Sequence, residues 1–268
     1  MPQAEVFGHP THWRVYGSGA RQGLALHCSL AHSGEWAGVA AGLPGLSLIA
    51  PDLPGHGRSG AWVGQQDLHD LTTRIALELA GAGPVDVIGH SFGATVALRL
   101  ALERPEAVRS LTLIEPVLFC AARAAGGPAY AAHQASHAPF EAAMRAGDRE
   151  AAAMAFHTIW GNGQPWLAMT PLQRDYILRR IGLVAAQNPV LNDDAAGLLA
   201  PWRLEGLGLP VLLLEGGASP PVIAAIMDEL ARRLPMVTRA VVPGAGHMLP
   251  VTHAAEVAEA IAGHLACA

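Results

Sequence analysis

A serine between two glycines is the feature of this chain best suited to covalent chemistry. The string Gly89-His90-Ser91-Phe92-Gly93 follows the apolar run Val85-Asp86-Val87-Ile88 and precedes a helical stretch that ends near Glu103. At a tight turn between a strand and a helix a serine exposes its hydroxyl, and flanking glycines avoid clashes of Cβ atoms. A hydroxyl is a weak nucleophile unless a base takes its proton and donors stabilise the oxyanion. We predict Ser91 as a nucleophile, for which the rest of the chain must supply partners.

The helix after this serine supplies the first of those partners. Its first backbone N–H groups have no acceptor within the helix and, together with the helix dipole, favour negative charge. The backbone N–H of Phe92, directly after Ser91, is therefore the first predicted oxyanion donor.

Short apolar runs with strand character alternate with helical patterns along most of the chain. Each run is short and apolar, as strands buried on both faces require. The predicted strands are residues 13–16, 24–28, 46–50, 85–88, 111–115, 211–214 and 239–242, and helices outside the middle of the chain are expected at 67–80, 94–103, 222–233 and 254–266. This alternation predicts an α/β fold, a mainly parallel sheet with helices on both faces.

The middle of the chain breaks this alternation. Residues 119–204 contain helical patterns at 140–145, 149–160 and 171–184 and no convincing strand. A segment of this length exceeds a simple crossover between strands, so we predict a helical cap, or lid, inserted into a core of residues 1–118 and 205–268. Its large apolar side chains either line an acyl-binding pocket or pack the cap onto the core: Met154, Trp160, Trp166, Met169 and Trp202.

Composition limits the classes of function. A chain of 268 residues with 51% hydrophobic content predicts one domain with one cleft. The net charge of -5, without a basic run, argues against nucleic acid and anionic membranes as partners. Cys28, Cys120 and Cys267 form no CxxC pair, so neither a disulfide framework nor a metal site is expected. The first residues lack a signal pattern and no stretch could span a bilayer, so we expect a soluble, cytoplasmic protein.

Four blocks in chain order resemble the α/β-hydrolase fold family, and the likeness covers nearly the whole chain. Leu26-His27-Cys28-Ser29-Leu30 resembles the family's His-Gly-x loop, and the segment from Pro51 to Ser59 resembles its Asp-x-Pro-Gly-x-Gly-x-Ser loop. The third block is the string around Ser91, and the fourth is Gly246-His247. The resemblance implies a doubly wound α/β-hydrolase sheet with a serine nucleophile and a helical cap.

The family pattern implies roles for two further residues. His247 lies in a loop after the last predicted strand, where an imidazole over Ser91 would act as general base and then as general acid. The backbone N–H of Ser29 takes the position of the second oxyanion donor. Cys28 stands where the family has a glycine, and a side chain there would narrow the entrance or rotate the loop.

The family pattern completes a catalytic triad with an acidic residue beside the serine and the histidine. In this sequence that acid is missing from its usual position. Many family members carry an aspartate shortly after the seventh strand, but residues 214–221 contain none. Glu115 ends the predicted strand that follows the helix after Ser91, and it is the first candidate. Some families of this fold place their acid at this position. Glu215 ends the next strand and is the alternative acid, although one residue later it would face the opposite side. Two further alternatives are no acid at all and, for Glu115, a salt bridge or a helix cap.

These features predict a serine hydrolase of small carboxylic esters or related acyl compounds, working through an acyl-enzyme at Ser91. Its partner is expected to be a small molecule with an apolar acyl part. No cofactor is expected, because the first helix lacks a GxGxxG string and the chain lacks a P-loop. Two alternatives stay open: the same triad could cleave a carbon–carbon bond or act as a lyase, or the fold could bind a ligand without turnover.

Overall fold

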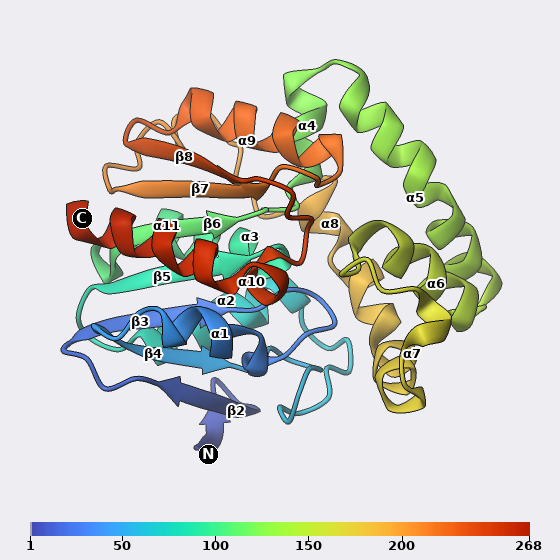
Figure 1. The fold of residues 1–268 in the computed structure, drawn as a ribbon, viewed down its shortest axis with the longest axis horizontal. Coiled ribbons are helices and arrows are strands. Elements are labelled where there is room, and N and C mark those ends of the chain that lie inside the picture. The colour runs from blue at the N-terminus through green and yellow to red at the C-terminus, as the bar shows by residue number, and fades with distance from the viewer. Residues whose placement is uncertain (1) are drawn as a thin grey trace.

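A single twisted sheet organises the molecule. The computed structural model describes residues 2–268, so Met1, the first residue of the predicted core, lies outside the described residues. Eight strands lie in the order β1-β2-β4-β3-β5-β6-β7-β8 (Figure 1). Their bounds are β1 Gln3–Val6, β2 His9–Tyr16, β3 Arg21–Leu26, β4 Leu46–Pro51, β5 Val85–His90, β6 Val108–Ile114, β7 Val211–Gly216 and β8 Val237–Val242. Among the described strands, β2 pairs antiparallel with both β1 and β4, and all the other pairs are parallel, which confirms the predicted, mostly parallel α/β sheet.

Helices cover both faces of the sheet, as a doubly wound fold requires. Their bounds are α1 Ala37–Ala41, α2 Leu68–Ala80, α3 Phe92–Glu103, α4 Phe119–Ala125, α5 Pro128–Ala146, α6 Arg149–Trp160, α7 Pro171–Ala186, α8 Asn188–Leu191, α9 Pro221–Arg233, α10 Leu249–Thr252 and α11 Ala254–Cys267. Helices α1 and α11 pack on one face, and α2, α3 and α9 pack on the other.

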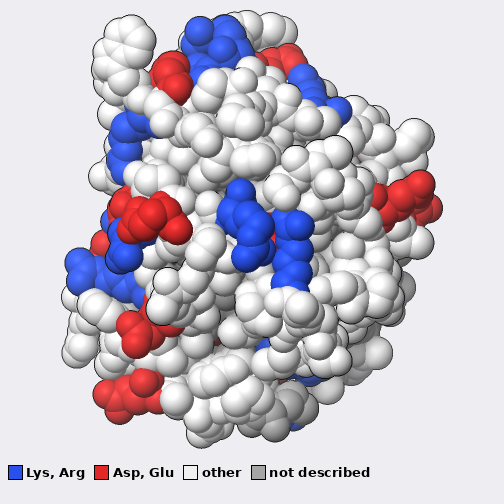
Figure 2. Space-filling model, turned by 90° about the vertical axis from the view of Figure 1, so that its left-hand side faces the viewer, with Lys and Arg blue, Asp and Glu red and all other residues white. Residues whose placement is uncertain are grey.

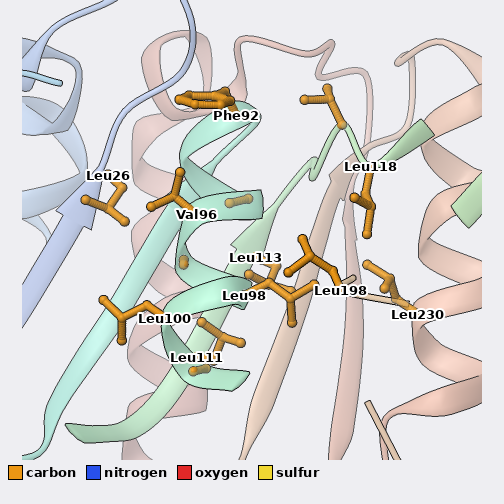
Figure 3. Packing of buried hydrophobic residues seen from close by; sticks show 14 of the residues in the cluster. Leu26, Phe92, Val96, Leu98, Leu100, Leu111, Leu113, Leu118, Leu198 and Leu230 are labelled. Carbon is orange, nitrogen blue, oxygen red and sulfur yellow. The ribbon is translucent and has the colours of Figure 1, made fainter. Parts of the chain in front are cut away.

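Strand side chains alternate between two apolar layers. On β7, Leu213 belongs to the layer formed with α2, α3 and α9, whereas Leu214 belongs to the layer formed with α1 and α11. Figure 3 shows the first layer, in which Leu98 of α3 and Leu113 of β6 share one buried cluster. Phe92, the first residue of α3, is fully buried in this cluster. The junction between β5 and α3 is therefore held by the main core.

Between β6 and β7 the chain forms helices, and three of them lie together at one end of the sheet (Figure 1). Helices α5, α6 and α7 enclose a small apolar cluster of their own that includes Phe140, Trp166 and Ile181. By contrast, α4 and the segment that carries Leu198 and Leu204 are buried in the main core. Trp160 of α6 and Leu183 of α7 also belong to the main core, so α5 to α7 are packed separately only in part. The predicted cap boundaries at residues 119 and 204 stay a prediction.

The short helices α1, α4, α8 and α10 were not predicted, and two further differences have clear physical causes. Strand β1 was not expected. Three of its four side chains are exposed, so its sequence lacks the apolar run of a buried strand, and the strand forms by pairing with β2. Helix α5 was expected only from Phe140, but it begins at Pro128 and continues through Pro139. Proline in a helix interior normally breaks the helix, and here the helix tolerates it.

The surface carries a mixture of charges. On the face opposite α5 to α7, basic and acidic side chains are interspersed, and neither sign forms a continuous patch (Figure 2). Within residues 2–268, no helix combines the length and apolar character needed to cross a bilayer.

Candidate active site

Ser91 lies at the turn between β5 and α3 with an unusual backbone conformation. Its φ is 55° and its ψ is -117°, a region that side chains rarely adopt. A Cβ on Gly89 would lie 2.4 Å from the carbonyl oxygen of Gly93, and one on Gly93 would lie 2.2 Å from that of Leu26. Both glycines are therefore required by close backbone packing, and the turn they permit places the serine hydroxyl at the carboxyl edge of the sheet.

A hydrogen-bonded chain joins three residues from distant parts of the sequence. The Ser91 hydroxyl lies 3.0 Å from His247 Nε2, and His247 Nδ1 lies 2.6 Å from Glu115 Oε2. All three side chains are buried. The arrangement fits a neutral imidazole that donates Nδ1–H to the carboxylate and accepts the serine proton at Nε2. The structure thus brings together the three residues for which a triad was predicted, although their catalytic roles stay a prediction.

Glu115 is held in place by three further contacts. Its backbone has a φ of 47°, and its N–H donates to the carbonyl of Leu214 on β7 at 3.0 Å. Its Oε1 accepts from the backbone N–H of Gly216 at 2.7 Å and from the hydroxyl of Ser219. Burial acts to raise the pKa of Glu115, but the hydrogen bonds from His247, Ser219 and Gly216 outweigh it and lower that pKa. The carboxylate is therefore ionised and oriented towards His247.

Glu215, the alternative acid, lies elsewhere. It is the last residue but one of β7, in register with Val241 of β8, and its Oε1 lies 2.6 Å from Arg239 Nη2. The carboxylate hydrogen-bonded to His247 is thus Glu115, and Glu215 forms an ion pair with Arg239. Ile114 and Leu214 are in register, so the two glutamates follow equivalent positions of β6 and β7. They point differently because Glu115 leaves β6 with a φ of 47°, whereas Glu215 continues β7.

Burial controls the protonation of His247. The ring is packed against Trp160 at 4.7 Å and His90 at 5.1 Å between ring centres. Burial lowers the pKa of His247, and the carboxylate of Glu115 offsets this only in part. A neutral imidazole near pH 7 follows, which is the form that can accept a proton from a hydroxyl.

A second pair of histidine and carboxylate supports the site from behind. His90 Nδ1 lies 2.6 Å from Glu35 Oε1, and His90 Nε2 lies 2.8 Å from the carbonyl oxygen of His247. Glu35 Oε2 also accepts from the backbone N–H of Cys28 at 3.2 Å. The pair therefore connects the loop that carries His247 to the loop that carries Ser29. The sequence analysis missed Glu35, because no local pattern marks it.

Among the described residues, the side chains of Cys28, Glu35 and His90 form the only group of three or more close enough together to be considered as metal ligands. Donor atoms of Cys28, Glu35 and His90 lie within 4.8 Å of one another. Burial raises the pKa of the Cys28 thiol well above its ordinary value, and the hydrogen bond between Glu35 and His90 engages the other two. These donors do not fit a metal, and we assign none to them.

Of the two predicted oxyanion donors, Ser29 lines the same cavity as the nucleophile, and Phe92 follows the nucleophile directly in the chain. Phe92 is the first residue of α3, so its backbone N–H belongs to the group that a helix leaves without an internal acceptor. Ser29 lines a small cavity together with Ser91 and His247. The hydroxyl of Ser29 donates to Gln187 Oε1 at 2.7 Å, which leaves its backbone N–H as the group predicted to face an oxyanion.

Three adjoining cavities connect Ser91 to the surface. The innermost, beside Ser91, has a volume of about 30 Å³. It shares Ser29, Phe156 and Trp160 with a second cavity of about 160 Å³, and the second borders an outer one of about 600 Å³. Of the apolar residues suggested for a pocket, Trp160 and Met169 line these cavities. Trp166 is buried among α5 to α7, and Met154 and Trp202 are exposed.

Comparison with known proteins places this geometry in a family. Residues 24–254 match the family described as alpha/beta hydrolase fold. "Lipase LipV" of Mycobacterium tuberculosis is 40% identical over 110 residues, which are 40% of this chain and 42% of that protein. "Magnesium-chelatase 30 kDa subunit" of Rhodobacter capsulatus is 30% identical over 90% of this chain and 86% of its own length. The chain thus spans less than half of LipV but most of the chelatase subunit.

Solved structures share the fold. The enol-lactonase of Burkholderia xenovorans LB400 superposes with a TM-score of 0.75 at 20% identity, over 99% of this chain and 100% of that one. The haloalkane dehalogenase DbeA-M1 loop variant of Bradyrhizobium elkanii superposes with a TM-score of 0.77 at 23% identity, over 99% and 95%. At these identities the likeness concerns the fold alone.

Proposed function

This chain belongs to the alpha/beta hydrolase fold family, and we propose that it is a serine hydrolase of small carboxylic esters or related acyl compounds. The observation that supports this most directly is the hydrogen-bonded chain from Ser91 through His247 to Glu115. Its distances fit the geometry that activates a serine hydroxyl. The name of the relative LipV supports the same class of reaction.

The proposed reaction proceeds in two halves. In the first, Ser91 Oγ attacks the carbonyl carbon while His247 Nε2 takes the hydroxyl proton, and the backbone N–H groups of Phe92 and Ser29 stabilise the oxyanion. The imidazolium then gives this proton to the departing alcohol, which leaves an acyl-enzyme. In the second half, water repeats these steps and releases the acid. Glu115 stays ionised and holds His247 in the reactive tautomer.

The helical segment is proposed to act as a cap. We assign residues 119–204 to this cap and residues 1–118 and 205–268 to the core. The two outer cavities lie between residues of both parts, with Ile177 and Met169 on one side and Met248 and Val251 on the other. Their apolar linings favour a substrate whose acyl part is apolar, and a small molecule is the proposed partner.

Labelling of the nucleophile tests the proposal. A fluorophosphonate probe should label the wild-type protein and not Ser91→Ala, because the probe requires an activated serine. With p-nitrophenyl acetate, a burst of p-nitrophenol should then appear, as expected when an acyl-enzyme accumulates. If the wild type is not labelled, the hydrolase proposal is wrong; if labelling occurs without turnover of esters, the carbon–carbon hydrolase or lyase alternative is favoured.

A second candidate is a binding role without turnover. The relative that covers 90% of this chain is named as a subunit of a magnesium chelatase, which is an assembly rather than a lone esterase. Under this alternative the fold would bind a ligand or partner, and Ser91→Ala would leave binding unchanged. The same labelling experiment separates the two, because a binder needs no activated serine.

A further inference from the structure

Two buried polar atoms beside Ser91 have no hydrogen-bond partner. They are Gln187 Nε2 and His137 Nδ1. Gln187 is 98% buried and His137 is 92% buried. Both residues line the innermost cavity, which Ser91 and His247 also line. Leaving a buried donor or acceptor unpaired costs about 1–3 kcal/mol, and proteins rarely do so without a reason. Both atoms therefore call for a partner from within the cavity.

The orientation of the Gln187 amide is fixed by its neighbours. Its Oε1 accepts from the hydroxyl of Ser29 at 2.7 Å, and its backbone N–H donates to the carbonyl of Val184 at the end of α7. With its oxygen engaged, the amide has only the Nε2 hydrogens left to offer. The Gln187 amide thus presents a donor to the cavity.

His137 presents a neutral ring to the same cavity. It comes from α5 and is packed against the rings of His133, at 5.3 Å, and Phe140, at 4.7 Å. Burial lowers the pKa of His137, with Glu141 opposing in part. A neutral imidazole can accept or donate one hydrogen bond at Nδ1, according to its tautomer.

The charge of the surroundings restricts the ligand. No Arg, Asp or Glu lines this cavity within residues 2–268, and the ionised Glu115 lies directly behind His247. A carboxylate or phosphate would have no counterion there. A neutral oxygen, as in a hydroxyl or a carbonyl, matches a donor from Gln187 and a neutral ring from His137. The volume of about 30 Å³ admits roughly one such small group.

We propose that Gln187 and His137 form a polar subsite that selects acyl groups carrying a neutral oxygen near the scissile carbonyl. The acyl side is assigned because the cavity is the innermost of the three, whereas the outer two lead to the surface and suit the departing alcohol. This inference rests on the proposed hydrolase function and specifies its substrate class as hydroxyacyl or oxoacyl esters.

The test compares matched methyl esters. Rates of acid release from methyl butanoate, methyl 2-hydroxybutanoate, methyl 3-hydroxybutanoate and methyl 3-oxobutanoate give kcat/KM by pH-stat titration. In the wild type, at least one oxygenated ester should exceed methyl butanoate by about tenfold, the scale of one satisfied hydrogen bond in a buried site. In Gln187→Met and in His137→Phe this ratio should fall towards one. Gln65→Met, at an exposed glutamine, should keep the wild-type ratio.

The ratio separates recognition from a structural role. If Gln187 only supported the fold, its variant would lower all four rates together and keep the ratio, which would overturn the subsite; His137→Phe provides the same test if Gln187→Met does not fold. Ratios near one for every oxygenated ester in a wild type that the fluorophosphonate labels would overturn the subsite alone. Absence of that labelling would overturn both the subsite and the hydrolase function.

Discussion

The carboxyl edge of the sheet and the helices α5 to α7 satisfy their polar groups very differently. At the sheet edge, Glu115 accepts hydrogen bonds at both carboxylate oxygens, and His90 is engaged at both ring nitrogens. On the helical side, Gln187 and His137 keep buried polar atoms without partners. The carboxylate and the imidazole that support His247 are therefore satisfied without a ligand, whereas Gln187 and His137 are not. Under the proposed function, the sheet edge supplies the reactive groups, and the helical side supplies the groups that select the substrate.

The largest effect is expected when the reactive group at the sheet edge is removed. Ser91→Ala should lower ester turnover by about a millionfold, the scale seen when a serine nucleophile is removed from an enzyme of this mechanism. The fold should survive, because the rest of the hydrogen-bond network does not depend on the hydroxyl. Single-turnover kinetics and a thermal melt measure the two effects, with the exposed Ser18→Ala as control. Retained turnover would remove the sheet edge from the mechanism.

The next prediction separates the two regions by stability. Phe140, 1% exposed, fills the cluster within α5 to α7, and Leu113 is a fully buried residue of β6 in the main core. Phe140→Ala should destabilise the helical part by about 3–5 kcal/mol through the cavity that it leaves. Hydrogen exchange should then increase in α5 to α7 and stay slow in β5 and β6, whereas Leu113→Ala should accelerate both. Equal acceleration in Phe140→Ala would show that the two regions unfold as one.

The acid of the site gives a smaller but specific effect. Glu115→Gln should lower kcat at least about a hundredfold, because the imidazole would lose both its orientation and the charge that stabilises its protonated form. Glu215→Gln is the matched control and should keep activity, since Glu215 pairs with Arg239 instead. Loss of activity in Glu215→Gln, with full activity in Glu115→Gln, would reverse the assignment.

The smallest expected effect is on the dependence of activity on pH. His247 must be neutral to accept the serine proton, and burial lowers its pKa from the ordinary 6.5. The value of kcat/KM should therefore stay constant as the pH decreases to 6.5 and fall about tenfold per unit only below the lowered pKa. In Glu115→Gln the fall should move to still lower pH, because the carboxylate raises the pKa of His247. A midpoint above 6.5 in the wild type would contradict the burial of this ring.

Much of the fold was predictable because buried parallel strands leave continuous apolar runs. Strands β5, β6 and β7 and the elbow helix follow from such runs and from the glycines that flank Ser91. Strand β1 left no pattern, because it is an exposed edge strand held by pairing alone. The start of α5 was missed because Pro139 interrupts an otherwise helical sequence.

Site residues could be predicted only where a local sequence pattern identifies them. The glycine-flanked turn identifies Ser91 and Phe92, and a charged residue at the end of an apolar strand identifies Glu115. Glu35 is not marked, because it meets His90 across 55 positions of sequence and its own surroundings are unremarkable. Gln187 was missed for the same reason: its significance lies in an unpaired atom, which only the folded arrangement reveals.

Two neighbouring strands, β5 and β6, are each followed by a residue with positive φ that is not glycine: Ser91 and Glu115. Such conformations cost about 1–3 kcal/mol each, a notable fraction of the roughly 5–15 kcal/mol by which domains are stable. Glycine at either position would relieve that cost and remove the functional group with it. The sequence best suited to folding is therefore not the one best suited to catalysis, and stabilisation of this protein by design should leave these two positions alone.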